Sequence, residues 1–229
     1  MKIEDFKIRA SACGNIMGVR GLGKTGETYC KDWLKGKVYN RVREINNKYT
    51  QKGNEVEDNS IDFVCEQLDL GFVLKNEKFY KNEFCQGTPD VILPDLIIDV
   101  KNSWDTHTFP LFESELPNKD YYYQAQVYME LVGVDNYKVV YVLSDTPEHL
   151  IEKEAYWYCK NNGYDELDLD ILDEFTRKMT YSDIPDKFKI KVFDIKRNQE
   201  DINLIKERVN ECRDYIKVLS LNLQNKTRC

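Results

Sequence analysis

Two aspartates and a lysine stand close together in the sequence, beside short apolar runs. Asp90 precedes the run 91–93, and Asp99 and Lys101 follow the run 96–98. Two carboxylates beside an ammonium can hold a divalent cation and orient a water molecule, which is the chemistry of metal-assisted hydrolysis. An Asp-x-Lys triplet alone is more often a solvated ion pair. The three residues therefore carry chemistry only if the fold brings them together.

A hairpin is the element that would do so. Pro94-Asp95 separates the two apolar runs and favours a tight turn, because proline presets φ for its first central position. A two-residue turn pairs Asp90 with Asp99. Side chains alternate along a strand, so Asp99 and Lys101 share a face and Val100 points away. Burying two acids side by side is costly, and a Mg²⁺ ion that keeps waters for a phosphate substrate would remove that cost.

Composition indicates one globular α/β domain spanning residues 1–229. The chain has 41% hydrophobic and 12% aromatic residues, and no linker, repeat or low-complexity tract divides it. No apolar run approaches the ~20 residues that a membrane span needs. The seven cysteines form no pair at zinc-ligand spacing, and their odd number, without a signal peptide, predicts reduced thiols in a cytoplasm.

The charge is unevenly distributed along the chain. The net charge is −7, but residues 1–52 hold 12 basic and 5 acidic residues, a balance of +7. This asymmetry predicts a basic face for phosphates, with chance clustering as the alternative. Arg9 and Ser11 lie beside small residues that let a backbone approach a phosphate. Lys31 and Lys35 belong to a helix predicted over 27–50, where they contact either DNA or only solvent.

A second sequence motif is typical of phosphate binding. Residues 18–25, GVRGLGKT, match the P-loop pattern GxxxxGK[ST]. A P-loop must follow a buried strand and open a helix, and no β-branched run precedes this stretch. We therefore favour a flexible basic loop, and a P-loop ATPase stays open as a rival function.

Two helices offer further site residues. The stretch 53–71 has Ile61, Val64 and Leu68 at helical spacing, and Glu57 falls on that inward face. Glu57 is either a third metal-site acid or a residue that caps the helix start. On a helix predicted over 118–133, Gln124 and Tyr128 share one face.

The remaining pattern completes an α/β arrangement. We predict an edge strand within 72–86, a central buried strand at 138–145, helices at 147–162 and 167–180, a strand at 188–197 and a long amphipathic helix over 199–223.

These residues also carry a resemblance. The order Gly53-x-x-x-Glu57, Asp90, Asp99-x-Lys101, Gln124-x-x-x-Tyr128 resembles the RecB-like and lambda-exonuclease-like (YqaJ-type viral recombinase) branch of the PD-(D/E)xK nucleases. Even the Pro-Asp of that signature is present. The resemblance spans about residues 7–132 and implies a restriction-endonuclease-like core, with a central mixed β-sheet flanked by helices. One departure is Asp99, which stands where Glu is commoner.

The resemblance implies a Mg²⁺- or Mn²⁺-dependent exonuclease that degrades one strand of linear duplex DNA for recombination. Such enzymes are often phage-encoded and act in the bacterial cytoplasm, and DNA, a single-strand annealing protein and further copies of the chain are the implied partners. The implied metal ligands are Glu57, Asp90, Asp99 and the Val100 carbonyl. Lys101 would orient the water, and Gln124 and Tyr128 would brace the site. The DNA-binding candidates are Arg9, Ser11, Lys31, Lys35 and Ser103.

Two alternatives follow from the resemblance. A non-cleaving protein that binds DNA ends on the same fold is the main one, and the complete set of two acids and a lysine argues against it. An iron–sulfur cluster occurs in another branch, but Cys159, Cys212 and Cys229 are too dispersed to hold one.

Overall fold

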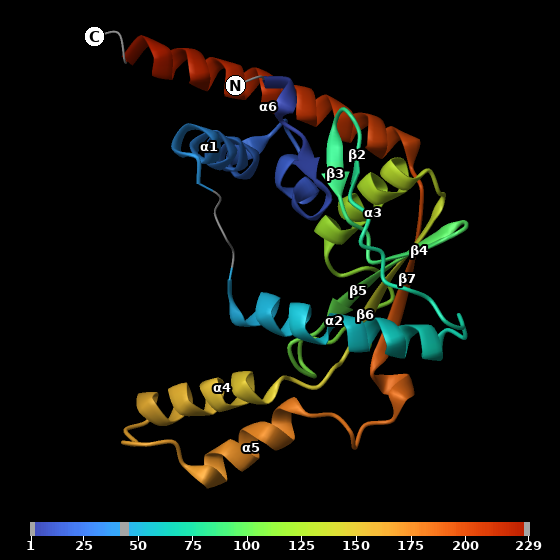
Figure 1. Ribbon diagram of the computed structural model, residues 1–229, viewed down its shortest axis with the longest axis vertical. Coiled ribbons are helices and arrows are strands. Elements are labelled where there is room, and N and C mark those ends of the chain that lie inside the picture. Colours follow the sequence, from blue (N-terminus) through green and yellow to red (C-terminus); the bar gives the residue numbers. More distant parts are fainter. Residues whose placement is uncertain (1–2, 42–45, 227–229) are drawn as a thin grey trace.

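A four-stranded mixed sheet forms the centre of the protein. The computed structural model describes residues 3–41 and 46–226 (Figure 1). The strand order is β4-β5-β6-β7, where β4 is Val91–Leu93, β5 is Leu96–Asn102, β6 is Asn136–Val142 and β7 is Ile190–Lys196. The β5–β6 pair is parallel, and the two outer pairs are antiparallel. The chain thus has the predicted α/β class with a central mixed sheet.

The predicted hairpin is confirmed in its register. Leu93 pairs with Leu96 and Val91 with Ile98, across a turn at Pro94-Asp95. The register is determined by the alternation of side chains, because a slip of one residue would move each apolar side chain to the other face of the sheet. β6 lies between β5 and β7, as its apolar run predicts, and β4 is left at the edge of the sheet.

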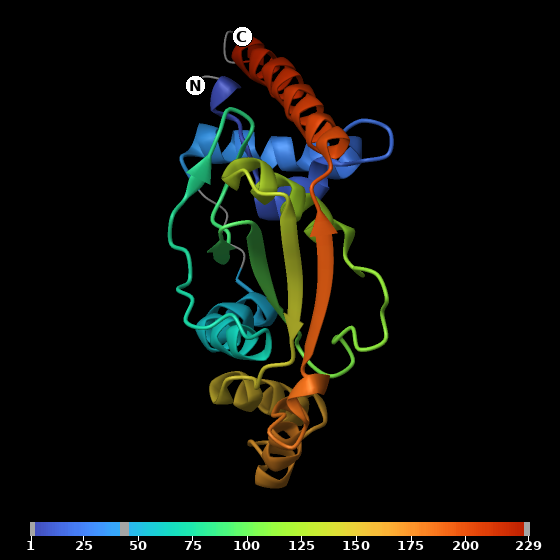
Figure 2. The same ribbon diagram turned by 90° about the vertical axis from the view of Figure 1, so that its right-hand side faces the viewer.

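The two faces of β5 belong to different cores. Ile97 packs in the larger core with α3 (Lys119–Val132), whereas Ile98 and Val100 pack with Ile61 of α2 (Lys48–Gln67) in the smaller one. Figure 1 shows β5 and β6 between α3, above them, and α2, below them, and Figure 2 shows the same strands in a view turned by 90°. Asp99 and Lys101 have the same parity as Ile97, so they point to the α3 face.

A second, small sheet lies beside the first. Its order is β1-β3-β2, with β1 at Ile8–Arg9, β2 at Tyr80–Lys81 and β3 at Cys85–Gly87. The edge strand predicted within 72–86 is confirmed at β2, which lies at the edge of this sheet, but it does not extend to Phe72, Val73 and Leu74. Residues 72–79 form no ladder, and Phe72 and Leu74 are exposed, because no strand lies alongside to bury their side chains.

The N-terminal region differs from the predicted helix over 27–50. Short 3₁₀ helices, η1 (Ile3–Asp5) and η2 (Ala10–Ile16), precede α1 (Gly23–Tyr39). α1 ends where Asn40 adopts a left-handed conformation with φ of 50°. The predicted helical anchors Val42 and Ile45 lie outside the described residues.

The P-loop reading fails at its structural requirement. The residues before Gly18 form the 3₁₀ helix η2, and α1 begins at Gly23, so no strand leads into the loop. A phosphate-binding loop of that class needs a strand to aim its backbone amides at the nucleotide.

The remaining helices lie where the sequence pattern predicts, except that α2 spans Lys48–Gln67 and not the predicted 53–71. α2 begins at a capping box formed by Asn47 and Thr50. The others are α4 (Glu148–Asn161), α5 (Leu169–Met179), the short η3 (Asp186–Phe188) and α6 (Gln199–Lys226). α4 and α5 extend from one end of the sheet, and α6 packs on α1 and α3 at the other (Figure 1). Among the described residues, no helix is long and apolar enough to cross a membrane.

Candidate active site

The acids and the lysine of the hairpin converge beneath α3. Asp99 is 1% exposed, and its Oδ2 lies 2.6 Å from Nζ of Lys101. Gln124 of α3 donates its Nε2 proton to Asp99 Oδ1 at 3.0 Å. Asp90 Oδ2 accepts a hydrogen bond from the Val100 backbone N–H at 2.9 Å. The hairpin therefore assembles the two carboxylates and the ammonium that the sequence predicts.

The two carboxylates repel each other. Burial, and after it the charge of Asp99, raise the pKa of Asp90 to about 7, because Lys101 and the Val100 N–H only partly offset these two effects. A carboxyl group with such a pKa holds its proton more readily than a solvated one. A divalent cation would stabilise the ionised form, because it supplies the missing positive charge.

The Val100 carbonyl faces the same edge. In an extended strand the N–H and C=O of one residue point to the same side, and the Val100 N–H points to Asp90. Continuing the β4–β5 register places Pro89 opposite Val100. Proline has no N–H to donate, so the edge strand leaves the Val100 carbonyl available to another partner.

Lys101 remains a cation in this arrangement. Burial lowers the pKa of Lys101, but the Asp99 and Asp90 carboxylates outweigh that effect and raise it above its usual value. Its Nζ also lies 4.7 Å from the centre of the Tyr121 ring. A protonated lysine can donate hydrogen bonds to a water or a phosphate oxygen, so the geometry favours the orienting role over that of a base.

Gln124 and Tyr128 brace the site from α3. Besides the Gln124–Asp99 bond, Tyr128 donates its hydroxyl proton to the Thr88 carbonyl at 2.9 Å. A Cβ on Gly87 would lie 2.8 Å from the Tyr128 ring, so only glycine lets the strand and helix approach this closely. α3 thus fixes both Asp99 and the segment that leads into Asp90.

Glu57 lies near these acids but does not join them. It is half-buried on α2, its charge adds to the rise in the pKa of Asp90, and its Oε2 accepts from Lys75 Nζ at 2.7 Å. In the described part of the chain no three Asp, Glu, His or Cys side chains are arranged to hold a metal. Glu57 would have to leave Lys75 to become a third ligand.

The hairpin nevertheless offers a set of donors that suits Mg²⁺ or Mn²⁺. Mg²⁺ usually takes one or two carboxylates and keeps several waters, and Asp90, Asp99 and the Val100 carbonyl supply hard oxygen atoms. Asp99 Oδ2 is buried and lies 2.6 Å from the Lys101 ammonium, so it already faces a cation. A buried carboxylate oxygen in this state is a strong candidate for a metal ligand.

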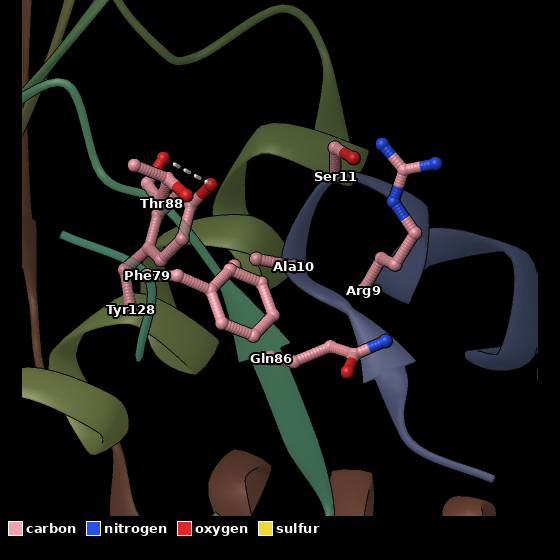
Figure 3. A pocket seen from close by; sticks show the side chains of 8 residues that line it. Arg9, Ala10, Ser11, Phe79, Gln86, Thr88 and Tyr128 are labelled. Carbon is pink, nitrogen blue, oxygen red and sulfur yellow. Dashed lines mark hydrogen bonds between the residues drawn. The ribbon is translucent and has the colours of Figure 1, made fainter. Parts of the chain in front are cut away.

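A pocket borders Gly87 and Thr88, in the segment that leads to Asp90. Its volume is about 260 Å³. Figure 3 shows Arg9 and Ser11 at one side and Thr88, Phe79 and Tyr128 at the other. Arg9 ends β1, and Ser11 lies in η2. Sequence reasoning found Arg9, Ser11 and Tyr128, but it missed Thr88 and Phe79, for which no motif gave a signal.

The other DNA-binding candidates are dispersed. Lys31 and Lys35 line a groove between α1 and α6, away from the hairpin, and they pair with Glu27 and Asp32. Ser103 follows β5, where it is 5% exposed and its hydroxyl has no hydrogen-bond partner among the described residues. The structure thus brings Arg9 and Ser11 to the pocket beside Thr88, but it does not bring Lys31 and Lys35 there.

A solved structure shows the same fold over nearly the whole chain. A phage related exonuclease from Haemophilus somnus 129PT is 30% identical, with a TM-score of 0.80, and the alignment covers 95% of this chain and 96% of that one. The chain belongs to the lambda-exonuclease-like (YqaJ-type) branch of the PD-(D/E)xK nucleases. The resemblance read from the hairpin and the flanking helices is therefore confirmed.

More distant members share the fold of this exonuclease family. An alkaline exonuclease from Laribacter hongkongensis is 15% identical with a TM-score of 0.68, covering 97% of this chain and 93% of that one. The same enzyme in complex with dAMP gives a TM-score of 0.68 at 16% identity, with the same coverage. No family model matches the sequence, and a search of curated proteins finds no match.

Proposed function

We propose that the protein is a Mg²⁺- or Mn²⁺-dependent exonuclease that hydrolyses linear duplex DNA. The observation that carries the proposal is the single segment 88–90, which forms a wall of the Arg9 pocket through Thr88 and supplies Asp90 to the acid pair. A pocket for one phosphate thus lies next to the residues that would cleave another. This placement is what removal of nucleotides from an end requires.

Each residue of the candidate site has its own role in the proposed reaction. Asp90, Asp99 and the Val100 carbonyl would hold the cation, with Glu57 as a further ligand once it is released from Lys75. A bound divalent cation lowers the pKa of a water ligand and neutralises charge on the phosphate. Lys101 would donate a hydrogen bond to the attacking water or to a phosphate oxygen and so orient it. Gln124 keeps Asp99 in place, because its Nε2 binds one carboxylate oxygen, while the other oxygen, 2.6 Å from Lys101 Nζ, would be shared with the metal.

The pocket suits a terminal phosphate. Arg9 is exposed at its side and offers a planar pair of donors, which match two phosphate oxygens, and the Ser11 hydroxyl adds a third donor. Phe79, 54% exposed, offers a face on which a terminal base can stack. We infer that a 5′-phosphorylated end is the preferred substrate, in recombination or in DNA processing during phage growth.

Digestion of defined duplexes tests the proposal. With Mg²⁺ or Mn²⁺ the protein should release nucleotides from linear duplex with 5′-phosphate ends, more slowly from 5′-hydroxyl ends, and not from a covalently closed circle. Excess EDTA should abolish release. Binding of linear ends without any metal-dependent release would contradict the proposal and favour the non-cleaving end-binding protein.

Arg9→Lys extends the same assay to the pocket. Lysine keeps the charge but loses the bidentate geometry, so the preference for phosphorylated ends should fall by about tenfold, while the rate on hydroxyl ends should change little. Lys35→Met is a control, since that lysine lies in the α1–α6 groove. An unchanged ratio of rates in Arg9→Lys would show that Arg9 does not read the end phosphate.

A further inference from the structure

The backbone of Asp90 lies at an edge that no strand covers. β4 is the outermost strand of its sheet, and it begins at Val91, immediately after Asp90. Strand pairing therefore holds Asp90 from one side only. A metal ligand in such a position needs another support, because a carboxylate must keep its place to bind a cation tightly.

The irregular segment before β2 supplies this support through Asn76. The Asn76 backbone N–H donates to the Asp90 carbonyl at 2.7 Å, and its side-chain Nδ2 donates to the Pro89 carbonyl at 2.8 Å. The same Nδ2 also donates to the Lys78 carbonyl at 3.1 Å, and the side-chain Oδ1 accepts from the Lys78 N–H at 3.2 Å. One asparagine thus stabilises its own turn and fastens it to two consecutive carbonyls of the Pro-Asp segment.

The adjacent residue ties the same segment to the third acid. Lys75 Nζ lies 2.7 Å from Glu57 and 2.9 Å from Asp58, both on α2. The segment 75–76 therefore contacts α2 through one residue and the edge of the sheet through the next. It spans the gap between Glu57 and Asp90, the two proposed ligands that come from different elements.

We propose that Asn76 is a positioning residue for the metal site, and that its side chain replaces the missing neighbour strand and keeps Asp90 in place. The inference rests on the proposed metal-dependent function. Asn76 itself does not touch the cation. It acts through the Pro89 and Asp90 backbone, and the loss of its side chain lets that edge of the sheet move.

The test measures Mn²⁺ affinity by calorimetry in the absence of DNA, for the wild type, Asn76→Ala, Asn76→Asp and the control Asn82→Ala. Asn82 makes a comparable turn, where its Oδ1 accepts from the Phe84 and Cys85 N–H groups, but no bond from it to Asp90 is present. Asn76→Ala should weaken Mn²⁺ binding by roughly tenfold, as is typical when a partner of a ligand is lost. Asn82→Ala should bind Mn²⁺ like the wild type.

Asn76→Asp separates the two roles of the side chain. Aspartate keeps the acceptor for the Lys78 N–H but loses the donor to the Pro89 carbonyl. Its extra negative charge would by itself strengthen cation binding, so weaker binding in this variant would come from the loss of the Nδ2 hydrogen bonds to the Pro89 and Lys78 carbonyls. Equal Mn²⁺ affinity in Asn76→Ala and the wild type would overturn the inference. Failure of the wild type itself to bind Mn²⁺ would instead overturn the proposed function.

Discussion

Asp90→Asn and Asp99→Asn should each lower the rate of nucleotide release by at least about a hundredfold, while the protein stays folded. Each substitution removes a charge that the proposed cation needs. Each also keeps an acceptor oxygen, so the Val100 N–H and the Gln124 amide retain their bonds. The measurement is single-turnover digestion of 5′-phosphorylated duplex in saturating Mg²⁺, with circular dichroism to confirm the fold.

Asp95→Asn is the matched control for this pair. It lies in the turn at the other end of the same hairpin, where its Oδ2 accepts from Asn136 Nδ2 at 2.7 Å. Activity of this variant should equal that of the wild type. Wild-type rates in either Asp90→Asn or Asp99→Asn would contradict the assignment of the metal site.

The stability of Asp90→Asn without metal gives an independent check. The pKa of Asp90 is raised from its ordinary value of 3.8 to about 7, so the folded state holds this proton more tightly than the unfolded state. Wild-type stability should therefore fall relative to the variant as the pH rises from about 4 to 7. The Tm of Asp90→Asn should exceed that of the wild type by a few degrees at pH 8, and the two should agree near pH 4.

Lys101→Met should lower the rate of release by about a hundredfold or more without weakening cation binding. Lys101 competes with the cation for the Asp99 carboxylate, from which its Nζ lies 2.6 Å, so its removal should leave Mn²⁺ affinity unchanged or increase it. Methionine retains most of the volume of the lysine stem. The measurement pairs single-turnover rates with calorimetric Mn²⁺ titration.

Lys138→Met controls for the loss of a lysine from the same sheet. Lys138 lies on β6 and pairs with Asp194 of β7, away from the acid pair. Lys138→Met should change neither the single-turnover rate of nucleotide release nor the affinity for Mn²⁺. If Lys101→Met lost Mn²⁺ binding together with activity, the lysine would be needed to build the site, and its role in orienting water or phosphate would be refuted.

The sequence was informative where local chemistry determines the structure. Pro94-Asp95 and the alternation around it set the hairpin register, which continues to place Asp90 opposite Asp99. Asp99 and Lys101 share a face because side chains alternate along a strand. The left-handed cap at Gly133, φ 84°, likewise ends α3 where predicted. In both places a short stretch of chain contains the information that its conformation requires.

Other parts depend on contacts between distant segments. The small sheet joins residues 8–9 to 85–87, and strands this short have no periodicity to detect. The helix predicted over 27–50 is confirmed only as far as Tyr39, because Asn40 adopts a positive φ, which a periodicity of apolar residues does not show. Lys75 and Asn76 lie in an irregular segment, so their bonds to Glu57 and Asp90 appear only in three dimensions.

The position of the cation tests the central claim most directly. Crystals grown with Mn²⁺ and measured near the manganese absorption edge should show an anomalous peak about 2.1 Å from oxygens of Asp90, Asp99 and the Val100 carbonyl. The same crystals of Asp99→Asn should lose most of that peak. Metal-dependent digestion by a protein whose only anomalous peak lies away from the hairpin would contradict the account.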